Sequence, residues 1–557
     1  MSKPTIRRLS DITKNEKFAR NIYRTELDKV AIATDLTACR KPVWISCFFD
    51  GTGNNYKEDG NGAMGASKQK YSNIAKLGKF AHTEKDVKNR TYAIYAQGVG
   101  TPFLEIGDSG GGLDKATGMA SAAKGQKRID WMLNKLKARI DAHMPHVNQI
   151  NVAVFGFSRG AAQARAFVRQ LAEQCYHQAD DQLIWTKSGG YIAPKLVIYF
   201  LGIFDTVAST GYGGSRLESA LPYVLTPITV LGPAFGGVLH AIDDGGHAEW
   251  ANDLRIPSYV RFCEHYVAAH EVREKFPSDS IRVNQATDAN CRETMYPGAH
   301  SDVGGGYDDM NQEGRANELS RIPLCNMYLS AYAAGVPFNP PEQVLEEAGG
   351  LFEITGELER CFNAYMKHIS ADNRLETQVI SHMNAYYHWR WGRTERQRAA
   401  RKEREAMIAK GQTIMYATPD KYMTITDAEW EKDVQNIAEK RTGLFRSSTE
   451  PVEDAIYEAW KGKLRKSMPV AERKSFDDFF DRYVHDSVAG FKNQMTDSHI
   501  GFIEFSRWTR NRQYFMGKRG KKFLYWRYEG AKPESSGVRE AMSTPKEGSA
   551  DGQSAVA

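Results

Sequence analysis

A serine stands between two glycines in the stretch NVAVFGFSRGAAQARAF, which runs from Asn151 to Phe167. Gly156, Ser158 and Gly160 form the pattern G-x-S-x-G, with an apolar run before it and an alanine-rich run after it. A nucleophile elbow needs a strand, a sharp turn that holds a strained serine, and a helix that starts at once. The pattern therefore predicts that Ser158 is a catalytic nucleophile. The alternative is a glycine-flanked turn without chemistry.

A serine nucleophile needs a base, and the base needs an acid that orients it. His300 lies in the glycine-rich run YPGAHSDVGGGY, whose tight turns can aim its ring toward the ends of the strands. Most of the other histidines occupy helical or charged surroundings, with His240 and His247 as partial exceptions. His300 is therefore the candidate base.

Several aspartates can supply the orienting acid. Asp205 ends the apolar run in GIFDTV, which follows the serine's helix, and Asp243 and Asp244 are alternatives. Asp302 is too close to His300 in the sequence to orient its ring and is better placed to cap the glycine loop. The chain order Ser, Asp, His is the order of an α/β-hydrolase, which favours Asp205. The alternative for Asp205 is a turn or helix-cap carboxylate.

The run FFDGTGNN, from Phe48 to Asn55, follows an early apolar stretch. In an α/β-hydrolase a loop at this place donates a backbone N–H to the oxyanion hole. We expect that N–H to come from Gly51 or Thr52 and to pair with the N–H of Arg159. The alternative is that Asp50 and the asparagines bind a cation or a phosphate. An anion beside this carboxylate would need a metal, so the oxyanion hole ranks first.

Hydrophobic periodicity predicts the elements that position these residues. The predicted strands and helices are Lys41–Phe49, Arg90–Gln97, Gln149–Phe155 and Lys195–Phe204 as strands, and Gln126–His143 and Arg159–Gln174 as helices. Strands that are apolar on both faces and alternate with helices indicate a mostly parallel sheet with helices on both sides, the α/β class. Functional residues then gather at the carboxyl ends of the strands, where Asp50, Ser158 and Asp205 stand.

The composition bounds the class of protein. With 41% hydrophobic and 25% charged residues, the 557-residue chain reads as a soluble globular protein. Its net charge of +6 is mild and no compact basic motif appears, which argues against nucleic acid as a partner. The seven cysteines have no CxxC spacing, so we expect neither a disulfide framework nor a metal site. No cofactor is expected, and calcium dependence stays open.

Composition along the chain suggests four regions. They are an N-terminal arm over 1–40, an α/β catalytic domain over 41–335, a charged and mainly helical region over 336–534, and a disordered tail over 535–557. The phrase VPFNPP at Val336–Pro341 marks the middle boundary. The basic stretch His388–Lys410 is either a solvated helix or a surface for anionic lipid or an acidic partner.

One uncharged segment, Ser219–Ile242, is long enough to span a bilayer. Its prolines, such as Pro227 and Pro233, would break a simple helix. We therefore interpret it as a buried or lid-like insertion within 211–250. The candidate lid or membrane contacts are Val230, Leu231 and Phe235.

Four motifs in this order, FFDGTGNN, GFSRGAAQARAF, FLGIFDTVAS and YPGAHSDVGGGY, resemble the first family of type VI secretion lipase effectors (Tle). The resemblance covers about Lys41 to Tyr307. It implies a phospholipase with an α/β-hydrolase domain, and it matches Ser158 to the nucleophile, His300 to the base and Asp205 to the acid. One departure is the run HYVAAHE, where His270 stands in place of a common aspartate.

The resemblance also implies a setting. Such a protein would be made in the cytoplasm, carried by a spike protein of a contractile secretion machine, and would act in the periplasm of a competing bacterium. The N-terminus has no apolar segment of a signal peptide, which agrees with that route. A phospholipid bilayer would be the substrate surface, and a cognate immunity protein would be a partner. The alternatives are a soluble serine carboxylesterase and a non-catalytic module that binds a spike or a membrane.

Overall fold

The structure is a computed structural model. It describes residues 3–33, 40–60, 70–81, 90–110, 118–178, 181–187, 193–208, 249–273, 276–283, 287–307, 311–411, 421–442, 457–459, 461–487, 489, 512–519 and 522–527. The uncharged segment with Val230, Leu231 and Phe235, the alternatives Asp243, Asp244, His240 and His247, and the tail 535–557 lie outside these residues.

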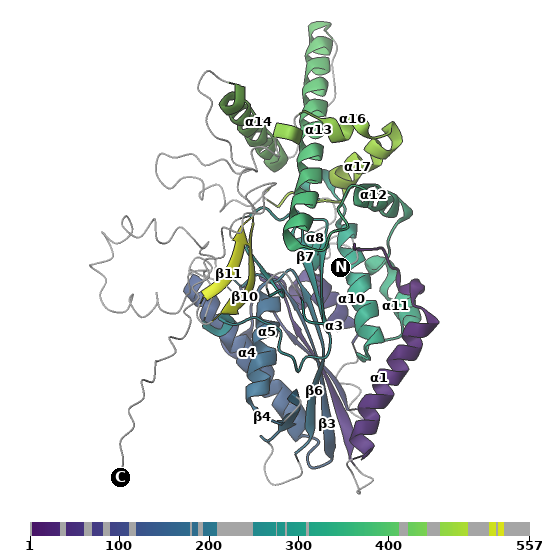
Figure 1. Ribbon diagram of the computed structural model, residues 1–557, viewed down its shortest axis with the longest axis vertical. Helices are drawn as coiled ribbons and strands as arrows, with labels where there is room; N and C mark the ends of the chain where they lie inside the picture. Colours follow the sequence, from purple (N-terminus) through teal and green to yellow (C-terminus); the bar gives the residue numbers. More distant parts are fainter. Residues whose placement is uncertain are drawn as a thin grey trace, which may run out of the picture.

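A mixed, mostly parallel sheet of eight strands forms the centre of the molecule (Figure 1). Six parallel neighbours run in the order β2 (Thr91–Ala96), β1 (Lys41–Phe49), β3 (Val147–Phe157), β6 (Lys195–Phe204), β7 (Cys263–Ala268) and β9 (Cys291–Tyr296). The short strands β5 (Leu183–Trp185) and β4 (Cys175–His177) add antiparallel pairing at the start of β6. The predicted α/β class with a mostly parallel sheet is confirmed.

Helices cover both faces of this sheet because its strands are apolar on both sides (Figure 1). On one face, α4 (Gly118–Asp141) and α5 (Arg159–Glu173) pack on strand residues such as Ile45. On the other, α1 (Lys14–Ala33), α3 (Asn73–Lys79) and α10 (Arg321–Ala333) pack on residues such as Phe48. Helix α1 lies in the region expected to be an N-terminal arm, and there it forms part of the packed structure.

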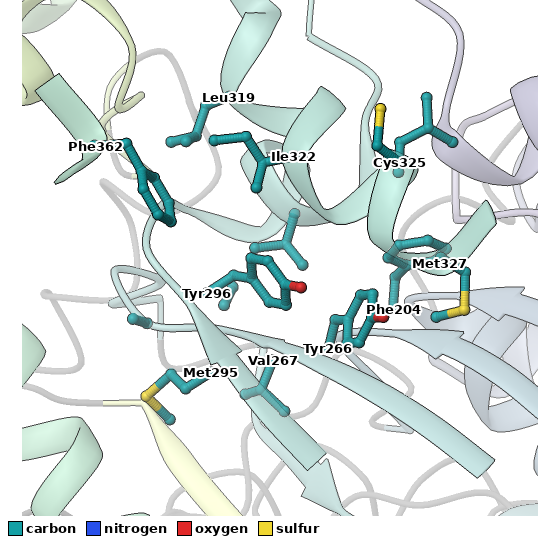
Figure 2. Packing of buried hydrophobic residues seen from close by; sticks show 14 of the residues in the cluster. Phe204, Tyr266, Val267, Met295, Tyr296, Leu319, Ile322, Cys325, Met327 and Phe362 are labelled. Atoms are coloured by element: carbon teal, nitrogen blue, oxygen red, sulfur yellow. The ribbon is translucent and has the colours of Figure 1, made fainter. Parts of the chain in front are cut away.

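The core beneath the ends of β6, β7 and β9 is dense and aromatic. Phe204, Tyr266 and Tyr296 come from these three strands and meet Ile322 and Met327 of α10 (Figure 2). Tyr266 and Tyr296 lie with their ring centroids 4.7 Å apart, and the Tyr296 hydroxyl accepts a 2.7 Å hydrogen bond from Asn326. This packing gives the strand ends that carry the candidate site a fixed base.

The region after 336 is mainly helical, as predicted. Its helices are α11 (Pro341–Ala348), α12 (Gly356–Met366), α13 (Leu375–Ala409), α14 (Lys421–Thr442), α16 (Lys463–Ser467) and α17 (Val470–Arg482). One hydrophobic cluster extends from Leu9 through the sheet to Val484, so residues on both sides of the expected boundary share a core. The remaining short elements are α2 (Tyr56–Gly60), α8 (His300–Gly304) and α9 (Asn311–Gly314), with 3-10 turns at Leu9–Asp11, Leu104–Ile106, Glu249–Ala251, Asn317–Ser320 and Gly349–Leu351.

A hairpin near the end of the chain is an exception to the helical region. Strands β10 (Gln513–Arg519) and β11 (Lys522–Arg527) pair with each other (Figure 1). Strand β10 also runs parallel to β8 (Ser278–Ser280), which belongs to the 41–335 region. Sequence analysis did not separate this hairpin from the helices. The signal that could have marked it is the pair of aromatic runs QYFM and KFLYWR, which a short glycine-containing stretch separates.

The basic residues of α13 mostly contact acidic residues of neighbouring helices. Arg396 forms ion pairs with Asp477 at 2.7 Å and Asp481 at 2.6 Å on α17. Arg398 and Arg401 lie 3.7 and 3.8 Å from Glu431 of α14. These guanidinium groups therefore hold helices together, which weakens the interpretation of the stretch as a surface for anionic lipid.

Among the residues described, no helix is both long and apolar enough to cross a bilayer. The six cysteines within the described ranges are free thiols.

Candidate active site

Ser158 lies in a strained turn between β3 and α5. Strand β3 ends at Phe157, α5 begins at Arg159, and the serine between them has φ 58° and ψ −127°. A positive φ in a residue other than glycine costs about 1–3 kcal/mol and persists only where the surroundings impose it. The side chain is 3% exposed. The turn is the elbow that the G-x-S-x-G pattern predicts.

The surroundings that impose this turn are backbone contacts. The Ser158 N–H donates to the Phe204 carbonyl at 3.0 Å, and its own carbonyl accepts from Val207 at 3.3 Å. A Cβ added to Gly160 would stand 2.3 Å from the carbonyl oxygen of Phe49, so the loop after β1 presses directly on the start of α5. No side chain fits at Gly160, which explains the second glycine of the motif.

Asp205 follows β6 as Ser158 follows β3. The two strands are paired with Phe157 opposite Phe204, so the serine and the aspartate emerge side by side at the carboxyl edge of the sheet. Asp205 also has a positive φ, 39°, and is fully buried. Its Oδ1 accepts a 2.9 Å hydrogen bond from the backbone N–H of Ala268.

His300 reaches this edge from the loop after β9, where it opens helix α8. Its Nδ1 donates to Oδ2 of Asp205 at 2.5 Å. The imidazole lies between two aromatic rings, with centroids 4.6 Å from Phe157 and 5.2 Å from Phe276. Because Phe157 immediately precedes Ser158, the histidine ring lies against the elbow.

Burial and charge set the protonation of this pair. Burial disfavours ionisation of Asp205, but Arg512 and then His300 outweigh it, so the pKa of the carboxyl lies well below its usual range. Burial also lowers the pKa of His300, against the opposing effect of Asp205. Near neutral pH the aspartate is ionised and the imidazole is neutral, which is the state that a general base requires.

Arg512 is the site residue that sequence analysis missed. It precedes β10, 307 positions after Asp205, and its two terminal nitrogens donate to both carboxylate oxygens at 2.8 Å each. The side chain is 1% exposed and also bonds to the carbonyls of Phe276 and Ala268. A lone arginine in the run RNRQYF carries no motif, so only the folded chain reveals this contact.

A second buried histidine supports the turn after Asp205. Nε2 of His265 accepts the backbone N–H of Thr206 at 3.2 Å, so the ring proton is on Nδ1, which donates to Glu293 at 2.9 Å. Burial opposes ionisation of Glu293, but His265 and then Arg282 lower its pKa to about 2. His270 lies five residues after His265 in the run HYVAAHE. Its Nδ1 accepts the N–H of Gly298 at 3.0 Å in the loop that carries His300. These histidines therefore position loops.

Asp302 caps the glycine-rich loop, as the sequence suggested. Its Oδ2 accepts the N–H of Ala299 at 2.9 Å, which closes the first turn of α8. Its other oxygen pairs with Nδ1 of His485 at 2.7 Å, and the His485 ring stacks on Tyr307 at 4.0 Å. Within the part of the chain that the structure describes, Asp302 forms no hydrogen bond with the ring of His300. The cap links the loop to the C-terminal region.

The loop after β1 lies against the elbow, where the oxyanion hole was expected. The N–H of Gly51 donates to Oδ1 of Asp50 at 2.7 Å, and the Arg159 side chain donates to the Thr52 hydroxyl at 2.8 Å. Gly51 touches Phe157, since an added Cβ would stand 2.5 Å from its ring. The three candidate residues thus meet at one place, although the N–H of Gly51 is already engaged.

Asp50 is buried and holds this loop from within. Burial raises the pKa of Asp50 to about 6, against the hydrogen bonds from Ser72, Tyr95 and Gly51. Within the described residues no group of three or more His, Cys, Asp or Glu side chains is arranged to hold a metal ion.

The sequence profile described as "T6SS, Phospholipase effector Tle1-like, catalytic domain" matches residues 44–183 and 169–330, slightly more than half of the chain in total. The chain belongs to the Tle1-like family of type VI secretion phospholipase effectors. The Tle1-like match includes Ser158, Asp205 and His300, and Arg512 lies beyond it.

Two solved structures are similar to the chain. An uncharacterized protein from Pseudomonas aeruginosa has a TM-score of 0.61 at 22% identity, over 92% of this chain and 84% of that one, which shows a shared fold. The Tle1 effector bound to the VgrG spike of the type 6 secretion system has a TM-score of 0.35 at 18% identity, over 63% of this chain and 87% of that one. Curated proteins gave no match.

Proposed function

We propose that the chain is a serine phospholipase that hydrolyses acyl esters of membrane glycerophospholipids. The observation that carries this proposal is the buried pair of Asp205 and His300 against a strained serine turn. A strained serine, a base and an orienting acid at one edge of a parallel sheet are the parts of a nucleophilic acyl-transfer site. Membership of a phospholipase effector family supports the lipid ester as substrate.

In the first half-reaction, Oγ of Ser158 attacks the ester carbonyl carbon while Nε2 of His300 takes the hydroxyl proton. The carbonyl π bond breaks and leaves an oxyanion on a tetrahedral carbon. The C–O bond to the lysolipid then breaks, the carbonyl re-forms as an acyl-serine, and His300 gives its proton to the departing alkoxide. Asp205 keeps the His300 proton on Nδ1 and stabilises the imidazolium.

In the second half-reaction, water replaces the lysolipid as partner. His300 takes a proton from water, the hydroxide attacks the acyl-serine, and the fatty acid leaves as Ser158 regains its proton. One backbone N–H at the start of α5 and one in the loop after β1 would hold the oxyanion in both halves, helped by the dipole of α5. We assign this role to Arg159 and Thr52, because the N–H of Gly51 donates to Asp50.

The setting of this activity is part of the same proposal. A member of a type VI effector family is carried to its target by a spike protein, and the periplasm of a competing bacterium exposes phospholipid bilayer to it. A producing cell then needs an immunity protein. Two experiments would test these partners. A spike protein should be pulled down by the full chain, and a co-expressed immunity protein should protect target cells.

The function is tested on vesicles. Phosphatidylethanolamine and phosphatidylglycerol vesicles are incubated with the wild type and with Ser158→Ala, and released fatty acid and lysolipid are measured. We expect release by the wild type alone. Activity on a short soluble ester without release from vesicles would indicate a carboxylesterase. Inactivity on both substrates, with binding to vesicles or a spike, would indicate a non-catalytic module.

A further inference from the structure

Arg512 contacts the carboxylate on which the proposed histidine depends. The carboxylate of Asp205 accepts four hydrogen bonds, two on each oxygen. Oδ1 receives the Ala268 N–H and one nitrogen of Arg512, while Oδ2 receives Nδ1 of His300 and the other nitrogen of Arg512. A bidentate guanidinium fixes the plane of a carboxylate as well as its charge. The direction in which Oδ2 faces His300 is therefore set partly by Arg512.

The fold holds Arg512 in place through strand pairing. Residues Tyr514 to Met516 of β10 pair in parallel with β8, so the strand that follows Arg512 is fixed to the catalytic domain. Strand β8 is fixed in turn to the turn after Asp205, because Asp279 donates its N–H to Thr206 at 2.9 Å and accepts the N–H of Ala208 at 3.0 Å. Arg512 and Asp205 are thus positioned by one continuous set of contacts, which consists of backbone hydrogen bonds and the Asp279 carboxylate.

Building on the proposed function, we propose that Arg512 is a positioning residue of the reaction. Its guanidinium holds the Asp205 carboxylate in the orientation in which Oδ2 accepts the Nδ1 proton of His300, and β10 thereby completes the active site. Arg512 acts through Asp205 and contacts neither reacting atom. The match to the catalytic domain of the family ends at residue 330, so Arg512 lies outside it.

The charged groups around His300 determine how the loss of Arg512 would change the pKa of the imidazole. Asp205 favours the imidazolium, whereas Arg273 and Arg512 disfavour it. Glu271 also faces this group, since one of its carboxylate oxygens lies 3.4 Å from the His300 N–H and pairs with Arg273 at 2.6 Å. The other neighbours of the ring, Phe157 and Phe276, are uncharged. Removing the positive charge of Arg512 should therefore raise the pKa of His300.

The test compares Arg512→Gln with Arg512→Lys. For Arg512→Gln we expect kcat/KM to fall about a hundredfold, as a misplaced catalytic group commonly does. We also expect the acid limb of its pH profile to move up by about one pH unit, the size of a neighbouring-charge effect. Arg512→Lys keeps the positive charge but cannot donate two parallel hydrogen bonds to the Asp205 carboxylate. Its kcat/KM should therefore fall while the acid limb stays near that of the wild type.

A matched control is Arg393→Gln. Arg393 also donates through two nitrogens to a buried carboxylate, that of Asp427, but it lies between α13 and α14. Its loss should lower thermal stability without moving the acid limb. An acid limb that does not move in Arg512→Gln, as in the control, would show a merely structural role and overturn the proposal, even where kcat/KM is lowered. Should Arg512→Gln not fold, unchanged kcat/KM in Arg512→Lys would overturn it equally.

A readout without turnover separates this proposal from the proposed function. The titration of His300 can be followed by NMR with carbon-13-labelled histidine, and its resonance is identified by its loss in His300→Asn. We expect a higher His300 pKa in Arg512→Gln whether or not phospholipid is hydrolysed. If the wild type releases no fatty acid but this shift occurs, the function fails and the contact stands. An unshifted titration overturns the role of Arg512 alone.

Discussion

Nδ1 of His300 lies 2.5 Å from Oδ2 of Asp205, although 95 residues separate the two in the chain. Strand pairing brings them together, because β6 is adjacent to β7 and β7 is adjacent to β9. The acid and the base thus come from strands two places apart, and the Ala268 N–H from the strand between them completes the contact.

Replacement of the serine tests the chemistry directly. Ser158→Ala should keep the fold and lose hydrolysis by on the order of a million-fold, as loss of a triad serine does. Fatty-acid release from vesicles measures this, with Ser10→Ala as a control because Ser10 is exposed and lies in the 3-10 turn Leu9–Asp11, outside the strands and loops that carry the site. More than a few per cent of wild-type activity in folded Ser158→Ala would refute the assignment.

Replacement of three aspartates, one at a time, tests which carboxylate orients His300. Asp205→Asn should lower turnover about ten-thousand-fold, because the amide favours the wrong tautomer of His300. Both carboxylate oxygens of Asp302 accept hydrogen bonds, from Ala299 and from His485, and Asp302→Asn replaces one of these oxygens by an NH2 group that cannot accept, so it should lower thermal stability more than turnover. Steady-state kinetics and melting curves of both variants, beside Asp244→Asn, separate these effects. A kinetic defect in Asp244→Asn that Asp205→Asn lacks would reassign the acid.

The tight packing at Gly160 of the elbow is tested by adding a methyl group. A Cβ at Gly160 would lie 2.3 and 2.4 Å from the carbonyl oxygens of Phe49 and Asp50. Gly160→Ala should therefore lower the free energy of unfolding by about 1–3 kcal/mol, as overpacking does, and displace the elbow. Gly356→Ala is the matched control, because nothing lies within 4 Å of its added Cβ. Urea unfolding measures both, and equal stability of the two variants would contradict the packing.

The buried carboxyl of Asp50 predicts a pH-dependent stability. Burial raises its pKa to about 6 in the folded state, from an ordinary value of 3.8. The folded protein therefore binds this proton more tightly, and the resulting stabilisation is complete below about pH 4 and lost as pH rises through about 6. Asp50→Asn cannot titrate, so it should gain on the wild type by on the order of 3 kcal/mol between pH 4 and 7.5. Urea unfolding at both pH values measures this, and a difference between the two proteins that does not change with pH would contradict it.

Charge reversal on α13 should act on helix packing. Arg396→Glu would place a third carboxylate beside Asp477 and Asp481, so we expect the melting temperature to fall by a few degrees. Lys402→Glu, on an exposed position of the same helix, should melt near the wild type. Weaker vesicle binding by Arg396→Glu with an unchanged melting temperature would restore the membrane interpretation.

Local patterns predicted the strands that carry the site. The apolar runs fixed β1 and β6 to the residue, and the serine, the aspartate and the histidine were located by turns that end strands. Such signals are local, because periodicity and glycine spacing reflect burial within one element. Arg512 has no such signal, since a single buried arginine is defined only by the partner that folding brings to it. The same holds for His485 on Asp302, which the sequence separates by 183 positions.

The pairing of β8 with β10 has a consequence for the order of synthesis. Ser158, Asp205 and His300 all leave the ribosome before β10, so a nascent chain can form the sheet while the Asp205 carboxylate still lacks its arginine. Hydrolytic competence would then arise only after the helices from α11 to α17 have emerged. In the cell that makes the enzyme, an inhibitor directed at the finished active site would have no full-strength target until β10 has been made.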